Sequence, residues 1–338
     1  MQKSSRSYPL ADYKVYWFDM HCVPCAKSLL GCSIRASAKH HFEQFAGSLK
    51  LKLQSIIAMK IMPRHIIAII LIAVASAPVA RSEPLPRPDH VVVVIEENRG
   101  YEQIMDKLNI NSYILALAMR GVLFTQSYGV THPSQPNYLA LFSGTTHDVT
   151  NNACLDSLDS DNLATRLLDS GLSFASFAES LPEVGDVTCI SGAYHRKHNP
   201  VSNWQGTRIS AELNKRFADF PQDFSKLPTI SFVIPDQDND MHDGSFKDAD
   251  DWLKTRIAPY ADWAMEHNSL LILTWDEDNY QADNHIVTIL VGPMVKPGKS
   301  AQRINHYSVL RTLLDFYGLP ALGASHDAEA IKDVWQKR

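Results

Sequence analysis

The segment His90-Val-Val-Val-Val-Ile-Glu-Glu-Asn98 is a continuous run of β-branched apolar residues that ends abruptly in two acids and an amide. Pro88 marks the start of the run. A strand that is apolar on both faces is typical of a parallel sheet covered by helices on its two sides. The run therefore predicts a buried parallel strand over 90–95 with polar groups at its carboxyl end.

Other apolar runs along the chain have the same character, and helix-like segments alternate with them. The further predicted strands are 121–126, 172–177, 229–234, 270–275 and 286–291. The predicted helices are 112–119, 135–142, 162–169 and 306–316. This alternation predicts an α/β fold with a mostly parallel central sheet and helices on both faces.

One more helix is predicted directly after Gly244. Ser245 is a suitable cap, Asp248 follows three residues later, and Pro259 should kink or divide the helix. One face is apolar through Phe246, Ala249, Leu253 and Ile257.

Three of the predicted strands run directly into polar clusters, at 96–98, 235–238 and 276–278. In open α/β sheets the ligand site lies beyond the carboxyl ends of the strands. We therefore expect these three clusters to converge.

The N-terminal region carries an export signal. Residues 62–65, Met-Pro-Arg-His, form a short basic start, and an apolar run of 12 residues and a small-residue exit follow them, which predicts a signal peptide over 59–82. The run is shorter than the roughly 20 residues of a membrane-spanning helix. We expect residues 1–58 to be a non-native or misassigned extension, with a cytoplasmic extension before a membrane anchor as the alternative. Residues 84–338 should form the functional domain, periplasmic or secreted and without a stable membrane span.

Charge is divided unevenly along the chain. Residues 1–80 carry ten Lys and Arg against three acids, a net charge of +7. Because the whole chain has a net charge of −5, residues 81–338 carry −12. Phosphate-backbone binding needs clustered basic residues, so the acidic body argues against nucleic acid as a partner.

Only two cysteines, Cys154 and Cys189, belong to the expected exported body. In an oxidising compartment such a pair predicts one disulfide. Upstream, Cys22 and Cys25 lack a second ligand pair and a βαβ pattern, so their spacing is attributed to chance.

Four candidate oxygen ligands stand at strand ends, namely Glu97, Asn98, Asp276 and Glu277. Hard oxygen donors suit at least one divalent ion such as Mg²⁺, Ca²⁺ or Mn²⁺, and Zn²⁺ stays open. The alternative is that these residues cap helices or face water.

Ser134 lies in the segment 131–144, which passes from a strand into a helix-like stretch with Pro136 in its first turn. A helix N-terminus favours a phosphate through its free N–H groups and dipole. A serine there can act as a nucleophile if a base or a metal activates it. The alternative is an ordinary N-cap.

Lys197 and His198 lie in a basic loop, and His242 follows another strand end. These groups could contact a phosphate or donate a proton. His285, just before the strand 286–291, is a weaker phosphate-binding candidate with a structural role as the alternative. Solvated loops are the alternative for the others.

Five ordered motifs together resemble the bacterial phosphoesterase family, which includes secreted acid phosphatases and phospholipases C within the alkaline phosphatase-like fold. The resemblance spans about 90–316. The motifs are Glu-Glu-Asn-Arg at 96–99, His-Pro-Ser-Gln-Pro-Asn-Tyr at 132–138, Arg-Lys-His-Asn-Pro at 196–200, Asp-Met-His-Asp-Gly at 240–244 and Thr-Trp-Asp-Glu at 274–277.

The resemblance implies a metal held by the four oxygen ligands named above, with Ser134 attacking phosphorus to form a covalent phosphoserine that water then hydrolyses. Glu277 replaces an aspartate found in some relatives and keeps its charge. Lys197, His198 and His242 would correspond to the groups that contact phosphate and donate protons.

The leading hypothesis is therefore a secreted metal-dependent acid phosphatase for phosphomonoesters, with phosphoinositides or a phospholipid head group among the candidate substrates. Its many histidines favour an acidic pH optimum. One alternative is a phospholipase C-type phosphodiesterase, and another is an inactive protein that binds phosphate or a phosphorylated ligand.

Overall fold

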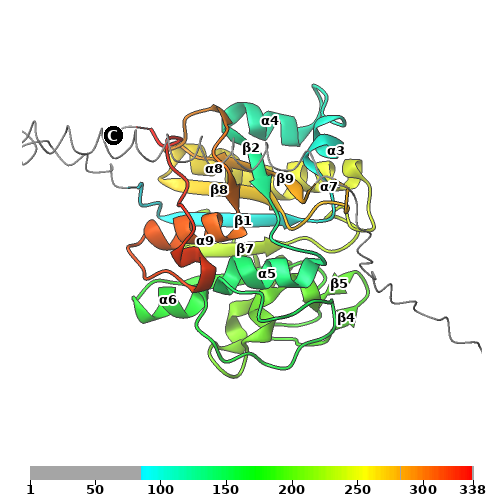
Figure 1. Ribbon diagram of the computed structural model, residues 1–338, viewed down its shortest axis with the longest axis vertical. Helices are drawn as coiled ribbons and strands as arrows, with labels where there is room; N and C mark the ends of the chain where they lie inside the picture. The colour runs from blue at the N-terminus through cyan, green and yellow to red at the C-terminus, as the bar shows by residue number, and fades with distance from the viewer. Residues whose placement is uncertain (1–84, 282, 337–338) are drawn as a thin grey trace, which may run out of the picture. The chain divides into compact units, whose positions relative to one another are not determined.

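The central sheet of the molecule has nine strands in the order β10-β2-β9-β8-β1-β7-β3-β6, with β11 paired to β2. Figure 1 shows β8, β1 and β7 of this sheet side by side. The computed structural model describes residues 85–281 and 283–336. The expected extension 1–58, the signal peptide 59–82 and the upstream cysteines lie outside the described residues. The strands are β1 (His90–Glu96), β2 (Val122–Tyr128), β3 (Phe174–Ala178), β6 (Asn214–Arg216), β7 (Ile230–Ile234), β8 (Ser269–Trp275), β9 (His285–Val291), β10 (Gly298–Ser300) and β11 (Ile304–Asn305).

The first predicted strand is the centre of this sheet. β1 pairs in parallel with β7 on one side and with β8 on the other, and β7 continues in parallel to β3. β9 is the exception, since it runs antiparallel to both β8 and β2. The prediction of a mostly parallel sheet is confirmed.

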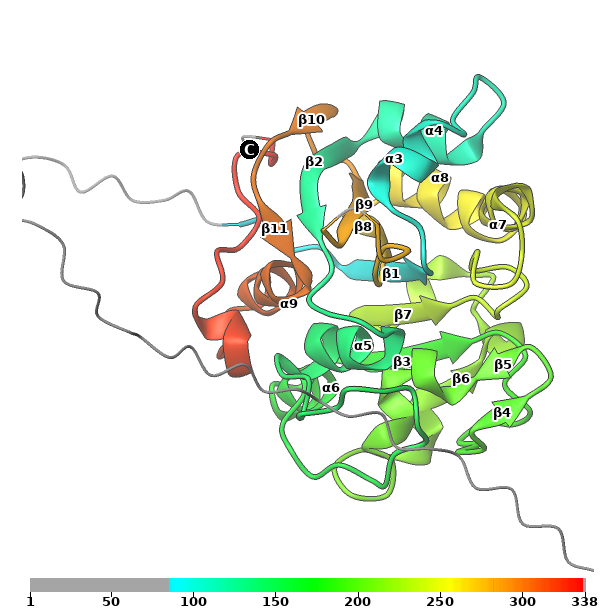
Figure 2. The same cartoon turned by 45° about the vertical axis from the view of Figure 1, so that its right-hand side comes forward.

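Helices cover both faces of the sheet, as expected (Figure 2). They are α3 (Tyr101–Met105), α4 (Tyr113–Arg120), α5 (Ser134–Ser143), α6 (Leu163–Asp169), α7 (Phe246–Trp252), α8 (Ala258–Glu266) and α9 (His306–Asp315). Val91 and Val93 of β1 pack on the side of α5, α6 and α9, whereas Val92 and Val94 pack on the side of α4, α7 and α8. Each of these four valines is fully buried, which stabilises the fold by roughly 1.5–3 kcal/mol per side chain.

The helix predicted after Gly244 is divided as Pro259 suggested. Ser245 caps α7 by accepting a hydrogen bond from the Asp248 backbone. A π-helical turn, η6 (Leu253–Ile257), separates α7 from α8, and Pro259 lies in the first turn of α8. A proline lacks the N–H that an unbroken helix needs at this point, so the helix restarts there.

Short elements between β3 and β7 were not predicted from the sequence. They are the hairpin β4 (Ile190–Ser191) and β5 (Tyr194–His195), and the 3₁₀ turns η1 (Arg196–His198), η2 (Pro200–Asn203), η3 (Ala211–Leu213), η4 (Phe217–Asp219) and η5 (Phe224–Lys226). A last 3₁₀ turn, η7 (Gly323–His326), follows α9.

The predicted disulfide is confirmed, because Cys154 and Cys189 are bonded. It joins the loop after α5 to the β4–β5 hairpin, across 35 residues of sequence. Among the described residues, no helix combines the length and the apolar character that crossing a membrane requires.

Candidate active site

The polar residues that follow β1 and β8 meet at one edge of the sheet, and Asp240, just beyond the cluster 235–238 predicted after β7, joins them. Within that predicted cluster, Asp236 instead accepts from the Ser180 hydroxyl at 2.6 Å. The backbone N–H of Glu97 donates to the Asp240 carbonyl at 2.8 Å, and that of Asp276 donates to the Glu96 carbonyl at 2.9 Å. The Asn98 N–H reaches Asp276 Oδ1 at 3.2 Å. The convergence of the clusters after β1 and β8 follows from the parallel strands, whose carboxyl ends lie at the same edge.

Ser134 is the first residue of α5 and is 1% exposed. Its hydroxyl is within hydrogen-bond distance of two carboxylates, at 3.1 Å from Glu97 Oε2 and 3.2 Å from Glu277 Oε1. The next helical N–H, of Gln135, donates to Asn152 Oδ1 at 3.0 Å. The helix therefore presents a serine hydroxyl, held between two acids, at its positive end.

Asn137 fixes the loop that carries this serine. Its Oδ1 accepts from the backbone N–H groups of Val130 and Thr131 at 2.9 and 3.0 Å, and its Nδ2 donates to the Thr131 carbonyl at 2.8 Å. These bonds satisfy backbone groups that neither the strand nor the helix can pair. The position of Ser134 is thus set by a neighbouring side chain on its own helix.

His132 lies between two acids on the opposite side of the loop. Its Nδ1 is 2.7 Å from Glu277 Oε2, and its Nε2 is 3.2 Å from Asp278 Oδ1. Burial lowers the pKa of His132, although the charge of Asp278 opposes that shift. The imidazole therefore holds the Glu277 carboxylate in position beside the Ser134 hydroxyl.

His198 forms a second bridge between acids. Its Nε2 is 2.9 Å from Glu97 Oε1 and its Nδ1 is 3.3 Å from Asp240 Oδ2, with all three side chains buried. Burial alone would lower the pKa of His198, but the charges of Glu97 and Asp240 raise it. We conclude that His198 holds its proton more strongly than a free histidine does.

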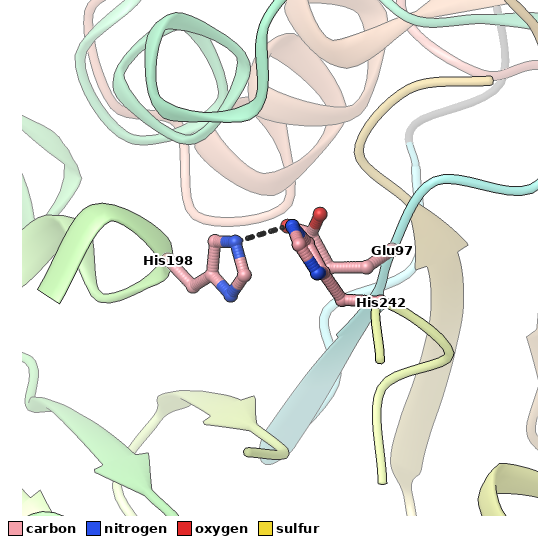
Figure 3. Close-up of side chains that lie close together, drawn as sticks. All are labelled: Glu97, His198 and His242. Atoms are coloured by element: carbon pink, nitrogen blue, oxygen red, sulfur yellow. Dashed lines mark ion pairs between the residues drawn. The ribbon is translucent and has the colours of Figure 1, made fainter. Parts of the chain in front are cut away.

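Glu97 is buried but favours its ionised form. Burial would raise the pKa of Glu97, but His198 and Lys197 lower it to about 2. Tyr138 donates its hydroxyl to Glu97 Oε1 at 2.7 Å and stacks on the His198 ring at 5.3 Å. Figure 3 shows the His198 ring directed at the Glu97 carboxylate, with His242 alongside.

Lys197 and His242 are in contact, with 3.0 Å between Nζ and Nε2. An ammonium can only donate, so Nε2 of His242 accepts and Nδ1 carries the proton. That Nδ1 donates to Asp243 Oδ1 at 2.7 Å. The lysine and the histidine therefore face the site as one basic unit.

The site holds more negative charge than its own residues neutralise. Burial and the charges of Glu97 and Glu277 hold the pKa of Asp276 well above its usual value, and Asp276 Oδ2 has no hydrogen-bond partner. Burial and the charge of Glu97 likewise raise the pKa of Glu277 to about 8. Buried carboxylates that crowd together in this way are suited to a cation.

Within the described part of the chain, one group of acidic and imidazole side chains could also hold a metal ion. A carboxylate oxygen of Glu97 and one nitrogen each of His198 and His242 lie within 4.8 Å of one another. Glu97 thus belongs both to this group and to the predicted oxygen ligands. A carboxylate with two imidazoles is a donor set that zinc accepts.

His285 does not join this group. Its ring is stacked between Tyr101 and Tyr128, at 4.5 and 5.1 Å, and its Nε2 is 3.1 Å from the Thr125 carbonyl. These contacts hold the start of β9 against β2 and α3. The alternative structural role stated for this residue fits its surroundings.

A cavity of about 350 Å³ opens above the serine. Its lining includes Asn98, Pro133, Ser134, Asn152, His242 and Glu277. The cavity therefore connects the candidate nucleophile, a candidate metal ligand and a basic group.

The chain matches a known protein family. The model of the phosphoesterase family matches residues 109–320. The chain belongs to the phosphoesterase family. The resemblance inferred from the five motifs is therefore confirmed.

Among family relatives, a phosphatidylinositol-3-phosphatase of Mycobacterium tuberculosis is 44% identical over 254 residues, which cover 74% of this chain and 84% of the relative. An acid phosphatase of Aspergillus fumigatus is 32% identical over 246 residues, covering 67% of this chain and 54% of the relative. The aligned part spans a little over half of that fungal protein. The expectation that the chain is a phosphoric monoester hydrolase is confirmed at the level of reaction class.

Solved structures are also similar to this chain, at low sequence identity. A protein of the alkaline phosphatase superfamily from Vibrio parahaemolyticus has a TM-score of 0.47 at 13% identity, covering 74% of this chain and 72% of that one. A phosphonate monoester hydrolase from Silicibacter pomeroyi has a TM-score of 0.49 at 14% identity, covering 74% and 76%.

Several contacts of the site were not predicted from the sequence. Those of His132, Tyr138 and Asp240 involve residues of the quoted motifs, so their positions near Ser134 or His242 in the sequence could have suggested them. His306 is different, because no motif marks it. Its Nε2 lies 2.6 Å from the Asp276 carbonyl, across 30 residues.

Proposed function

We propose that this chain is a metal-dependent phosphatase that hydrolyses phosphomonoesters through a phosphoserine on Ser134. The observation that carries the proposal is the position of the Ser134 hydroxyl, between Glu97 and Glu277 at the N-terminus of α5. A serine is a weak nucleophile until a base or a metal activates it. Here two carboxylate oxygens lie close enough to receive its proton.

The phosphoryl group would bind above Ser134, in the cavity that His242 and Glu277 line. Lys197 would donate to a non-bridging phosphate oxygen when it turns from His242. The positive end of the α5 dipole would favour the same anion. Phosphoryl transfer depends on positioning and on charge compensation, which these groups supply.

Proton transfer completes each half of the reaction. We propose that a carboxylate takes the proton of Ser134 as Oγ bonds to phosphorus, while the leaving alkoxide takes a proton from His198 or His242. In the second half, the same histidine takes a proton from the water that attacks phosphorus, the Ser134–phosphorus bond breaks as phosphate is released, and the carboxylate returns its proton to Ser134. His198 suits the role of donor because neighbouring acids raise its pKa.

The residues fit a divalent cation, for which Glu97, Asn98, Asp276 and Glu277 are the proposed ligands. Crowding of the Asp276 and Glu277 carboxylates against Glu97 supports this assignment. When bound, such an ion would neutralise developing charge on the phosphoryl group and lower the pKa of a coordinated hydroxyl. Mg²⁺, Ca²⁺, Mn²⁺ and Zn²⁺ are all candidates for this donor set.

The test compares Ser134→Ala with Ser143→Ala, which removes a second buried serine at the far end of the same helix. With p-nitrophenyl phosphate, Ser134→Ala should lose turnover by at least about a thousandfold, in the range seen when a nucleophile is removed. Ser143→Ala should retain it. Acid-quenched wild type should carry phosphate on the peptide that contains Ser134. Turnover by Ser134→Ala at the wild-type rate would disprove the mechanism.

The two alternative functions predict different results in the same assay. A phosphodiesterase of the phospholipase C type would prefer p-nitrophenyl phosphorylcholine to p-nitrophenyl phosphate. A binding protein would retain phosphate without turning over either compound. We expect the monoester to be the better substrate, in keeping with the phosphatase names of the relatives.

We further propose that the mature protein is exported to the periplasm or secreted. The Cys154–Cys189 disulfide supports this location, since disulfides persist in oxidising compartments. N-terminal sequencing of the protein from the periplasm or medium would test it. An intact residue 1 would contradict cleavage of a signal peptide.

A further inference from the structure

The turn η1, which carries Lys197 and His198, is fixed to the central sheet at its C-terminal end. Asn199, directly after the turn, is fully buried. It donates to Asn214 Oδ1 at 2.7 Å and accepts from the Ser176 hydroxyl at 2.9 Å. These two partners belong to β6 and β3, so this end of the turn is held by the sheet itself.

The N-terminal end of the same turn is held by Arg196, through the two loops that the disulfide joins. Its guanidinium donates from Nη1 to the Val187 carbonyl at 3.1 Å and from Nη2 to the Leu155 carbonyl at 3.0 Å. Nη1 also lies 3.5 Å from Cys154 Sγ, and the Arg196 backbone N–H donates to the Cys189 carbonyl at 2.9 Å. Arg196 therefore contacts the chain on both sides of the disulfide.

Burial of this charge is costly, and no acid offsets it directly. Arg196 is 8% exposed, all the acceptors of its guanidinium are neutral, and it makes no ion pair with a described residue. Burial accordingly lowers the pKa of Arg196. An apolar side chain would avoid this cost but could not join two loops, whereas the planar guanidinium donates in two directions at once.

The two functional side chains of η1 depend on this anchor to different degrees. His198 is buried, and its ring is also held by Glu97 at 2.9 Å. Lys197 is half-buried, and its ammonium contacts His242 at 3.0 Å, a contact that it leaves in the proposed reaction. Because Lys197 directly follows Arg196, loss of the anchor should displace Lys197 more than His198.

From these contacts we propose that Arg196 is a positioning residue, which ties Lys197 to the Cys154–Cys189 bridge and so sets the affinity of the site for phosphate. Arg196 does not touch the substrate and acts through Lys197. The inference rests on the proposed phosphatase and adds to it a residue outside the reacting groups.

The first experiment separates binding from chemistry in Arg196→Ala. With p-nitrophenyl phosphate, KM should rise about tenfold, the fold-change of one charged hydrogen bond, while kcat changes less than about threefold. The Kd of inorganic phosphate, measured by calorimetry, should rise by the same factor as KM. Arg196→Lys keeps the charge but not the fork, so its KM should lie between the two.

Arg120→Ala is the matched control, because Arg120 also joins two parts of the chain, on the opposite face of the sheet. Its guanidinium contacts Asp262 at 2.6 Å and the Ala261 carbonyl at 3.4 Å. KM and Kd should equal those of wild type in this variant. An unchanged KM in Arg196→Ala, or the same rise in Arg120→Ala, would overturn the assignment. If Arg196→Ala loses its native circular dichroism, Arg196→Lys takes its place in the comparison.

A double-mutant cycle tests whether Arg196 acts through Lys197. Lys197→Ala should itself raise the Kd of phosphate, and adding Arg196→Ala to it should raise the Kd by less than about twofold more. A purely structural role of Arg196 would instead weaken binding about equally in both backgrounds. A further tenfold rise in the double variant would therefore refute the positioning role.

The part played by the disulfide is tested in the variant with both Cys154→Ser and Cys189→Ser, at a temperature where it stays folded. Its KM should rise severalfold with little change in kcat, and Arg196→Ala should add little to that rise. A wild-type KM in this variant would remove the disulfide from the assignment.

The two measurements also distinguish this inference from the proposed function. If wild type binds phosphate but releases none from p-nitrophenyl phosphate, the phosphatase fails, and the response of Kd still decides whether Arg196 positions Lys197. If wild type hydrolyses the ester and neither KM nor Kd responds to Arg196→Ala, only the positioning role fails.

Discussion

Nε2 of His306 lies 2.6 Å from the carbonyl oxygen of Asp276. His306 opens α9 and is 1% exposed, so α9 is anchored directly to the strand end that carries a proposed metal ligand. Because a carbonyl can only accept, Nε2 carries the ring proton and the neutral tautomer is fixed. The position of Asp276 thus depends on a helix that begins 30 residues later.

This contact predicts a specific loss of stability in acid. Burial lowers the pKa of His306 to about 4, below its unfolded value of about 6.5. The unfolded state therefore binds the proton more readily, so stability is complete above pH 6.5 and falls by up to roughly 3 kcal/mol as the pH drops to 4. His306→Asn, which cannot titrate, should show a shallower fall. Urea unfolding at pH 7 and pH 4.5 measures this loss in the free energy of unfolding. An equal loss in wild type and His306→Asn would contradict the assignment.

Metal removal should lower the stability of wild type more than that of Glu277→Gln. Without a cation, burial and Glu97 raise the pKa of Glu277 to about 8, above its unfolded value, so metal-free protein should lose stability between pH 4.5 and 8. In Glu277→Gln the amide removes the repulsion with Glu97 and also lowers the affinity of the site for the cation. Thermal unfolding with and without chelator, together with metal content, provides the test. Glu266→Gln, at an exposed position, is the control and should behave as wild type.

Loss of the disulfide should cost about 3–4 kcal/mol, the chain-entropy value for a loop of 35 residues. The double variant Cys154→Ser and Cys189→Ser should therefore unfold at a lower urea concentration than wild type. A reducing agent should bring wild type to the same midpoint and leave the variant unchanged. Insensitivity of wild type to complete reduction would rule out a stabilising role.

Asp250 should prove important for the stability of α4. Its two carboxylate oxygens accept from the backbone N–H groups of Tyr113 and Ile114 at 2.9 and 2.8 Å, so α7 caps the start of α4. Asp250→Ala should cost about 1–2 kcal/mol, the usual range for a lost N-cap. Asp251→Ala removes only an exposed pair with Lys247 and should change stability by less than about 1 kcal/mol. Equal effects in chemical denaturation would refute the cap.

The principal strands were predictable because burial on both faces leaves a continuous apolar run, as in β1 and β8. β6, β10 and β11 were missed because each has only two or three residues, and their pairing depends on neighbours far away in sequence. Local patterns cannot reveal such edge strands. The same limit hid the cap that Asp250 provides for α4.

The candidate site likewise has contacts that the sequence predicts and contacts that it does not. Glu97, Asp276 and Glu277 follow apolar strands, so their convergence could be predicted from sheet geometry alone. The contacts of His198 with Glu97 and Asp240 require the path of the segment between β3 and β7, which no period in the sequence encodes. His285 was considered because it precedes a strand, and the structure packs its ring between two tyrosines.

The anchoring of Asp276 by α9 has a consequence for biosynthesis. Glu97 enters the fold with the first strand, yet the carbonyl of Asp276 gains its histidine partner only when residue 306 has been made and packed. An emerging chain therefore passes through a long interval in which the nucleophile exists but its surroundings are incomplete. Hydrolytic competence should therefore appear late, only after residue 306 has emerged and α9 has packed against the strand end.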